Sequence, residues 1–140
     1  MSPRRRRLTP DELVAAARTT VAECAMPAFL VGADSRIMAW NGAASEFFGI
    51  PAWNASALSC ALVVHGCLRD GKPVCTPGCW LLNGKKAGPV PEAMEMVIRT
   101  GRPPSGQRLA RVIHTRITHP RAGQLGLLHT MIPIADEFGS

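Results

Sequence analysis

The feature of the sequence that most constrains the fold is a pair of strand-like runs, residues 28–31 and 36–40, separated by only four residues. The first run is apolar throughout, and the connection between them, Gly-Ala-Asp-Ser, has the composition of a turn. Strands joined by so short a connection pair as an antiparallel hairpin. Asn41 follows the second strand and can cap a short helix that ends at Gly49.

Helix signals coincide in the segment before this hairpin. Thr9 can act as an N-cap, Pro10 suits the first helical position, and Glu12 completes a capping box with Thr9. Apolar side chains then recur at helical spacing, at Leu13, Ala17, Val21 and Cys24. The sequence therefore predicts a helix from Pro10 to about Cys24, which ends before Pro27.

The second half of the chain carries signals for one more helix and two longer strands. Pro91 can open a helix over residues 91–100, which Gly101 would end. The runs 109–118 and 125–134 read as strands, joined by a connection of hairpin length. His114 and His129 would then form a cross-strand pair. The order of elements predicts an α+β fold, in which helices cover an antiparallel sheet.

The 140 residues are 46% hydrophobic, which suits one folded domain and excludes disorder of the whole chain. The formal net charge is +6, but Arg4–Arg7 supply four of the sixteen basic residues. The other twelve basic residues are nearly balanced by ten acidic ones, so the basicity lies mainly in this arm. We expect a basic disordered arm over residues 1–8, the helix within 9–26 and the domain over 27–136. Nucleic acid could bind only through the arm.

The sequence predicts no segment that enters or crosses a membrane. No apolar run approaches the roughly 18 residues that a transmembrane helix needs. Asp11 and Glu12 lie where a signal peptide would require apolar residues. We therefore expect a cytoplasmic protein, whose five cysteines are thiols, metal ligands or redox groups rather than structural disulfides.

The segment from Phe29 to Gly49 resembles the opening of a PAS domain. That family begins with an apolar strand, an Asp-containing turn, a strand that ends in Trp-Asn, and a helix that ends in Phe-Gly. The matching positions are Asp34, Ile37, Trp40, Asn41, Ala44, Phe47, Phe48 and Gly49. The resemblance covers roughly residues 20–135 and implies a PAS-like antiparallel sheet flanked by helices. It also implies a scaffold that senses ligands, redox state or light and relays the signal to a partner.

Four of the five cysteines fall within one Pro- and Gly-rich segment, with the spacing C-x6-C-x7-C-x3-C; they are Cys60, Cys67, Cys75 and Cys79. The last pair has the close spacing of a metal knuckle, with Pro77-Gly78 as a turn. A cluster of thiolates suits zinc or an iron–sulfur cluster. The segment also resembles a Cys-rich subset of bacterial PAS domains with a Gly-x-Pro-x-Cys-x-x-x-Cys motif.

Three interpretations of these cysteines stay open. Three or four of them bind a metal or an iron–sulfur cluster, with His65 as a possible further ligand. Alternatively, Cys75 and Cys79, or Cys60 with one of them, form a reversible disulfide. In the third interpretation the thiols only pack, as we expect of Cys24 on the first helix.

Other cofactors of PAS domains find less support in the sequence. The flavin-binding segment Asn-Cys-Arg-Phe-Leu-Gln is missing, and the chain has no tyrosine of the kind that the photoactive yellow class requires. Haem-binding members often carry a histidine on the helix before the last hairpin, and residues 91–100 contain none.

No nucleophile–base motif, phosphate loop or paired carboxylates appear, so we expect no enzyme. The sequence predicts a sensory module that regulates a partner protein, or an output domain beyond this chain, through the Cys-rich site. We expect a homodimer that pairs through the first helix. The alternative is a dimerisation or binding module whose cysteines hold structural zinc or have no ligand.

Overall fold

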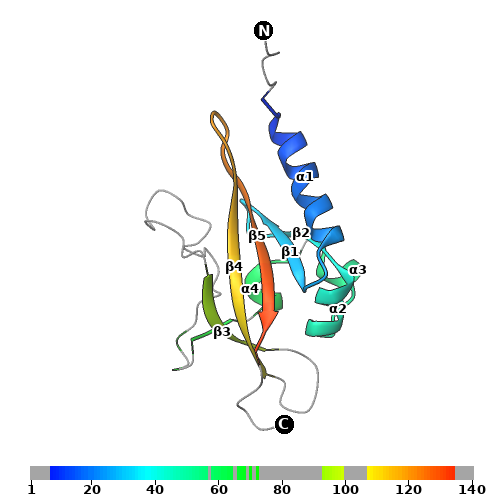
Figure 1. Cartoon of the computed structure of the whole chain (residues 1–140), viewed down its shortest axis with the longest axis vertical. Helices are drawn as coiled ribbons and strands as arrows, with labels where there is room; N and C mark the ends of the chain where they lie inside the picture. Colours follow the sequence, from blue (N-terminus) through cyan, green and yellow to red (C-terminus); the bar gives the residue numbers. More distant parts are fainter. Residues whose placement is uncertain are drawn as a thin grey trace.

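A computed structural model of the chain describes residues 7–56, 58–64, 66–68, 70, 72, 93–99 and 107–134. Within these residues, five strands form one antiparallel sheet in the order β2-β1-β5-β4-β3 (Figure 1). The strands are β1 (Ala28–Gly32), β2 (Ile37–Trp40), β3 (Ala93–Arg99), β4 (Gln107–His119) and β5 (Gly123–Pro133). This arrangement confirms the predicted α+β fold and both predicted hairpins.

Helix α1 (Pro10–Glu23) packs against one face of the sheet, here called the outer face (Figure 1). Its predicted capping box is present, since the Glu12 amide donates to Thr9 Oγ1 at 3.1 Å and the Thr9 amide donates to Glu12 Oε1 at 3.0 Å. Ala17 and Val21 are buried in a cluster with three residues of the sheet, Ala28, Leu30 and Leu128. The apolar stripe of the helix is therefore largely buried within the chain itself. No described helix is both long and apolar enough to span a bilayer.

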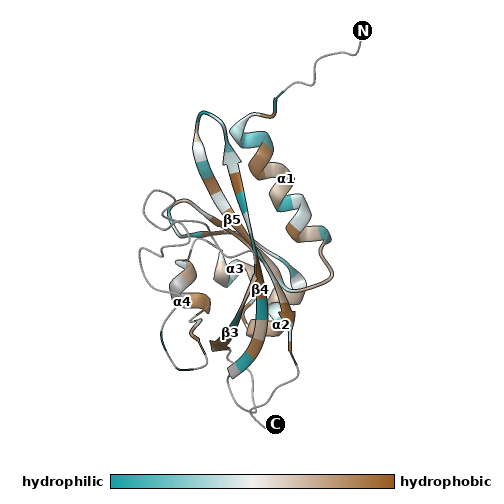
Figure 2. Cartoon of the chain, turned by 60° about the vertical axis from the view of Figure 1, so that its left-hand side comes forward, coloured by the Kyte–Doolittle hydropathy of each residue, from teal (hydrophilic) through white to brown (hydrophobic). Residues whose placement is uncertain are grey.

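The main core lies on the opposite, inner face of the sheet, against α2 (Gly42–Phe48), α3 (Ala52–Ala55) and α4 (Cys60–Val64). Its largest fully buried side chains include Phe29, Phe48, Ile98, Leu127 and Met131. Figure 2 shows hydrophobic and hydrophilic residues mixed along the β4–β5 hairpin. Four consecutive residues of β5, Gly126–His129, are buried, because both faces of the sheet are covered there. Successive residues of β1 accordingly join different clusters, with Leu30 on the outer face and Phe29 on the inner face.

Asn41 joins α1, β1 and α2 at the point where the hairpin ends. Its side-chain Oδ1 accepts hydrogen bonds from the amides of Ala28 at 3.1 Å and Ala44 at 2.8 Å. Its Nδ2 donates to three carbonyls at the end of α1 and just beyond, at 2.9–3.2 Å, those of Val21, Cys24 and Met26. The predicted cap of α2 is thus confirmed, and Gly49 ends that helix with a φ of 74° as its C-cap.

The prediction of a helix over residues 91–100 is wrong, because residues 93–99 form β3. This strand pairs with β4 in a regular antiparallel register. Met94, Met96 and Ile98 alternate onto the inner core, whereas Glu95 between them is exposed. Buried apolar side chains therefore recur at every second residue, as in a strand. Pro91 and Gly101 do not distinguish the two structures, because proline and glycine can flank a strand as well as a helix. Because residues 93–99 form a strand, the lack of a histidine in residues 91–100 no longer counts against haem.

Candidate functional site

The segment that carries Cys60 and Cys67 is bound at both edges of the sheet. At the first edge, Ser59 forms an isolated bridge with Arg36, and the Cys60 amide donates to Ser35 O at 2.7 Å, just before β2. At the other edge, the backbone of Cys67 pairs with Val97 of β3 through two hydrogen bonds of 2.8 and 2.9 Å. Since β2 and β3 are the two edge strands, Cys60 and Cys67 are held at opposite edges.

Both of these cysteines are half-buried. Cys60 packs against the main core, and the Cys67 thiol donates to Val97 O at a distance of 3.7 Å. Cys75, Cys79 and His65 lie outside the described residues, so convergence of the four predicted ligands stays a prediction. In the part of the chain that the structure describes, no three His, Cys, Asp or Glu side chains gather as a metal site. Cys24 packs against the outer-face cluster, as expected.

A pair of buried histidines lies on the inner face, one on β4 and one on β5. His114 and His129 are direct cross-strand partners, which confirms the predicted pair. Both are less than a tenth exposed, and their rings meet edge to face with centroids 5.0 Å apart. The His129 ring also stacks on Phe29, with centroids 4.4 Å apart and an interplanar angle of 11°.

The surroundings of His129 keep its imidazole neutral. Burial, and next the neighbouring His114, lower the pKa of His129 from its ordinary value of 6.5 to about 3, against a smaller opposing effect of the Leu127 carbonyl. Because Nδ1 lies 3.2 Å from that carbonyl oxygen, the neutral ring carries its proton on Nδ1 and donates it there. Nε2 is then left with a lone pair, which can accept a hydrogen bond or bind a metal. The sequence indicated the pairing of the two strands but not this burial.

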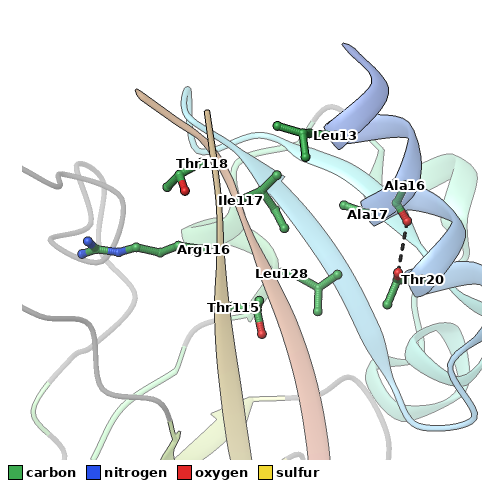
Figure 3. Close-up of a pocket in the computed structure, with 9 residues that line it drawn as sticks. All are labelled: Leu13, Ala16, Ala17, Thr20, Thr115, Arg116, Ile117, Thr118 and Leu128. Carbon is green, nitrogen blue, oxygen red and sulfur yellow. Dashed lines mark hydrogen bonds between the residues drawn. The ribbon is translucent and has the colours of Figure 1, made fainter. Parts of the chain in front are cut away.

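A groove lies on the outer face between α1 and the β4–β5 hairpin (Figure 3). It is lined by Leu13, Ala16, Ala17, Thr20, Thr115, Arg116, Ile117, Thr118 and Leu128. The Thr20 hydroxyl is bound to Ala16 O at 3.1 Å, and the Arg116 side chain points away from the helix. The groove thus offers an apolar contact surface rather than a group of reactive side chains.

Comparisons with known proteins show which fold this arrangement of strands and helices has. No protein-family model matches the sequence, and no curated protein matches it either. Among solved structures, the PAS domain of nitrogen regulation protein NR(II) from Vibrio parahaemolyticus is 18% identical, with a TM-score of 0.55 over 84% of this chain and 96% of that one. The PAS domain of BvgS from Bordetella pertussis is 12% identical, with a TM-score of 0.59 over 89% and 88%. The chain has the PAS fold.

The structure of this chain also matches that of a LOV protein from Rhodobacter sphaeroides, which is 10% identical, with a TM-score of 0.60 over 91% of this chain and 69% of that one. The expectation drawn from the segment Phe29 to Gly49 is therefore confirmed at the level of the fold. Because one fold serves many functions, these likenesses assign no ligand to this chain. Membership of the Cys-rich subset stays a prediction.

Proposed function

We propose that this chain is a non-enzymatic sensory module of the PAS fold, whose cysteine segment regulates a partner. The signal is the binding of a metal or iron–sulfur cluster by the cysteines, or the oxidation of their thiols. The observation that supports this proposal is the attachment of the segment to both edges of the sheet. Its backbone is bound beside β2 at Cys60 and beside β3 at Cys67.

This attachment gives a thiol reaction a direct effect on the sheet. A disulfide requires Cα atoms about 4.4–6.8 Å apart, and a metal requires all its thiolates within a few ångströms. Cys60 and Cys67 start from opposite edges of the sheet. A reaction that draws either toward Cys75 or Cys79 pulls on its backbone hydrogen bonds. The edge strand β3, which is held by β4 on one side and by Cys67 on the other, is the element that we expect to respond.

The chemistry of the donors fits a thiolate-held group. Cys60 and Cys67 are only half-buried, so a ligand or an oxidant can reach them. Three or four thiolates, those of Cys75 and Cys79 with one or both of Cys60 and Cys67, would hold zinc or an iron–sulfur cluster, which supply structural rigidity or redox sensitivity respectively. Zinc has no redox chemistry of its own, and only its thiolates could then respond to oxidant.

We further propose that the module works in the cytoplasm, where thiols stay reduced, and as a homodimer that acts on an output domain or a regulatory protein.

The test is to purify the full chain without oxygen and to measure its metal, sulfide and absorbance. We expect bound zinc, or iron with sulfide and a visible colour, in the parent and in the matched control Cys24→Ser. Cys67→Ser and the double variant Cys75→Ser, Cys79→Ser should lose the bound metal. Exposure to oxidant should change the hydrogen exchange of β3 in the parent but not in the double variant.

Two results would count against the sensor. Colourless protein with stoichiometric zinc, and no change in exchange on oxidation, would favour the alternative of a binding module with structural zinc. Protein without metal, whose β3 exchanges equally in reduced and oxidised samples, would leave the cysteines as packing residues.

A further inference from the structure

The inner face of the sheet places a methionine beside the buried pair of histidines. Met131 follows His129 by two residues on β5, and the register sets it opposite Val112 of β4. His114 follows Val112 by two residues, so Met131 is also the diagonal neighbour of His114. Diagonal neighbours on one face of a sheet lie roughly 7–8 Å apart, a gap that long side chains can bridge. One thioether therefore has both imidazoles within its reach.

The three side chains share one buried environment. His114 and His129 are each less than a tenth exposed, and Met131 is fully buried in the inner core. The Phe29 ring stacks on His129, with centroids 4.4 Å apart, and covers one face of that imidazole. A ligand held by these three groups would thus be shielded from water.

The hydrogen bond of His129 sets the direction of its second nitrogen. Nδ1 donates to the carbonyl of Leu127, which lies two residues earlier on the strand. The opposite edge of the ring, which carries Nε2, therefore faces the side of Met131, two residues later. A backbone carbonyl that accepts from the other ring nitrogen is also how proteins orient an imidazole that binds a metal.

The two imidazoles are close enough to share one ion. Their centroids are 5.0 Å apart, and their planes meet at 77°. Two imidazoles with bonds of about 2.1 Å to the same metal have centroids roughly 5–6 Å apart. A neutral imidazole offers one unprotonated nitrogen whichever tautomer it adopts. The strands β4 and β5 therefore need no movement to hold an ion between His114 and His129.

The donors favour a soft ion of low charge. Thioether sulfur selects Cu(I), and imidazole nitrogen also suits copper. Among the described residues, the buried polar side chains are Asn41, His114 and His129, and this set contains no carboxylate for a hard cation. Three neutral ligands leave the charge of the ion uncompensated, and a single charge costs less to bury than the double charge of zinc.

We propose that His114, His129 and Met131 bind one Cu(I) ion on the inner face of the sheet. Burial, and next the neighbouring His114, lower the pKa of His129 to about 3, so protons do not compete for Nε2 at neutral pH. Because the third ligand is a thioether, the site agrees with the absence, among the described residues, of three His, Cys, Asp or Glu side chains at one place.

The test is an anaerobic titration of the full chain with Cu(I), followed by NMR of isotope-labelled histidine and methionine. The thiols also bind Cu(I), but these labels report on the proposed site directly. We expect the resonances of His129 Nε2 and of the Met131 methyl group to shift together, at the same amount of added ion. The methyl group of Met96, which is buried on the same face but two strands from Met131, should not shift.

Met131→Leu removes the sulfur and nearly conserves the volume, and Met96→Leu is its matched control. A Cu(I) chelator, added stepwise while the His129 signal is followed, gives the dissociation constant at the histidines. We expect it to rise at least about tenfold in Met131→Leu, the lower end of what the loss of even an outer-shell partner costs a metal site. Met96→Leu should bind like the parent.

Three results would overturn the proposal. An unshifted His129 Nε2 in the parent, with bound Cu(I), would show that the thiols alone hold the ion. Equal dissociation constants in the parent and in Met131→Leu would remove the thioether from the site. Zinc that shifts the same resonances at lower concentration would replace Cu(I) as the ion. The proposal does not depend on the cysteine sensor, because the histidine and methionine signals report its success or failure separately.

Discussion

At the scale of single residues, Asn41 shows what local sequence can and cannot predict. Its place between a strand and a helix indicated a cap, and its bond to the Ala44 amide confirms that role. The other half of the side chain binds carbonyls at and beyond the end of α1, among them those of Val21 and Cys24. A local pattern could not predict these contacts, because they depend on how α1 docks against the hairpin.

The pair His114 and His129 also shows what local sequence can and cannot predict, here at a candidate site. Alternation along the two strands placed them opposite one another, as the register confirms. Their burial depends on Phe29 and on the inner core, which come from other parts of the chain. For this reason the lowered pKa of His129 was not predictable from the hairpin alone.

We predict that this pair makes the fold sensitive to acid. The folded pKa of His129 is about 3, below its ordinary value of 6.5, so its contribution to stability is fully present above pH 6.5 and is lost as the pH falls toward 3. Across that window this group lowers the free energy of unfolding by about 1.4 kcal/mol per pH unit. Urea denaturation between pH 7 and 4.5 measures the effect. His129→Phe should flatten this dependence, whereas His119→Gln, at the end of β4, should keep it. If the free energy of unfolding fell equally with pH in the parent and in His129→Phe, other groups would cause the acid sensitivity.

At the scale of secondary structure, prediction succeeded where two independent signals agreed. α1 had a capping box and a helical apolar period, and α2 had both an Asn cap and a Gly end. β3 had helix-like boundaries but a strand-like period, and the pairing with β4 decided its structure. The short helices α3 and α4 have too few residues to show a period, and they form because their side chains pack on the inner face.

Substitutions at two glycines, Gly126 and Gly42, can test how closely the backbones of β1 and β5 approach each other. A Cβ on Gly126 of β5 would lie 2.7 Å from the Val31 carbonyl oxygen of β1, whereas one on Gly42 of α2 would meet nothing within 4 Å. We expect Gly126→Ala to lower the free energy of unfolding by about 1–3 kcal/mol, because a backbone must shift. Gly42→Ala should raise it by up to about 1 kcal/mol, since alanine favours the helix. Chemical denaturation measures both, and equal changes in the two variants would contradict the close approach of β1 and β5.

At the scale of the whole molecule, the sequence predicted the fold better than the assembly. The stripe on α1 that was expected to pair two copies is largely occupied, since Ala17 and Val21 are buried against the chain's own sheet. An amphipathic helix has the same pattern whether it covers its own sheet or that of a second copy. The homodimer therefore stays a prediction, and any contact through α1 must use the remaining part of its surface.

We predict that this contact includes the groove between α1 and the β4–β5 hairpin (Figure 3). Ala16 lines the groove and is exposed, whereas its neighbour Ala15 is exposed but does not line it. Ala16→Glu would bury a charge in each half of a symmetric interface, so we expect the dissociation constant of the dimer to rise at least about tenfold. Ala15→Glu adds the same charge to the same helix and should leave it nearly unchanged. Sedimentation velocity over a range of concentrations measures both constants. A parent that sediments as a monomer at all concentrations would contradict the dimer, and equal weakening by both substitutions would move the contact away from the groove.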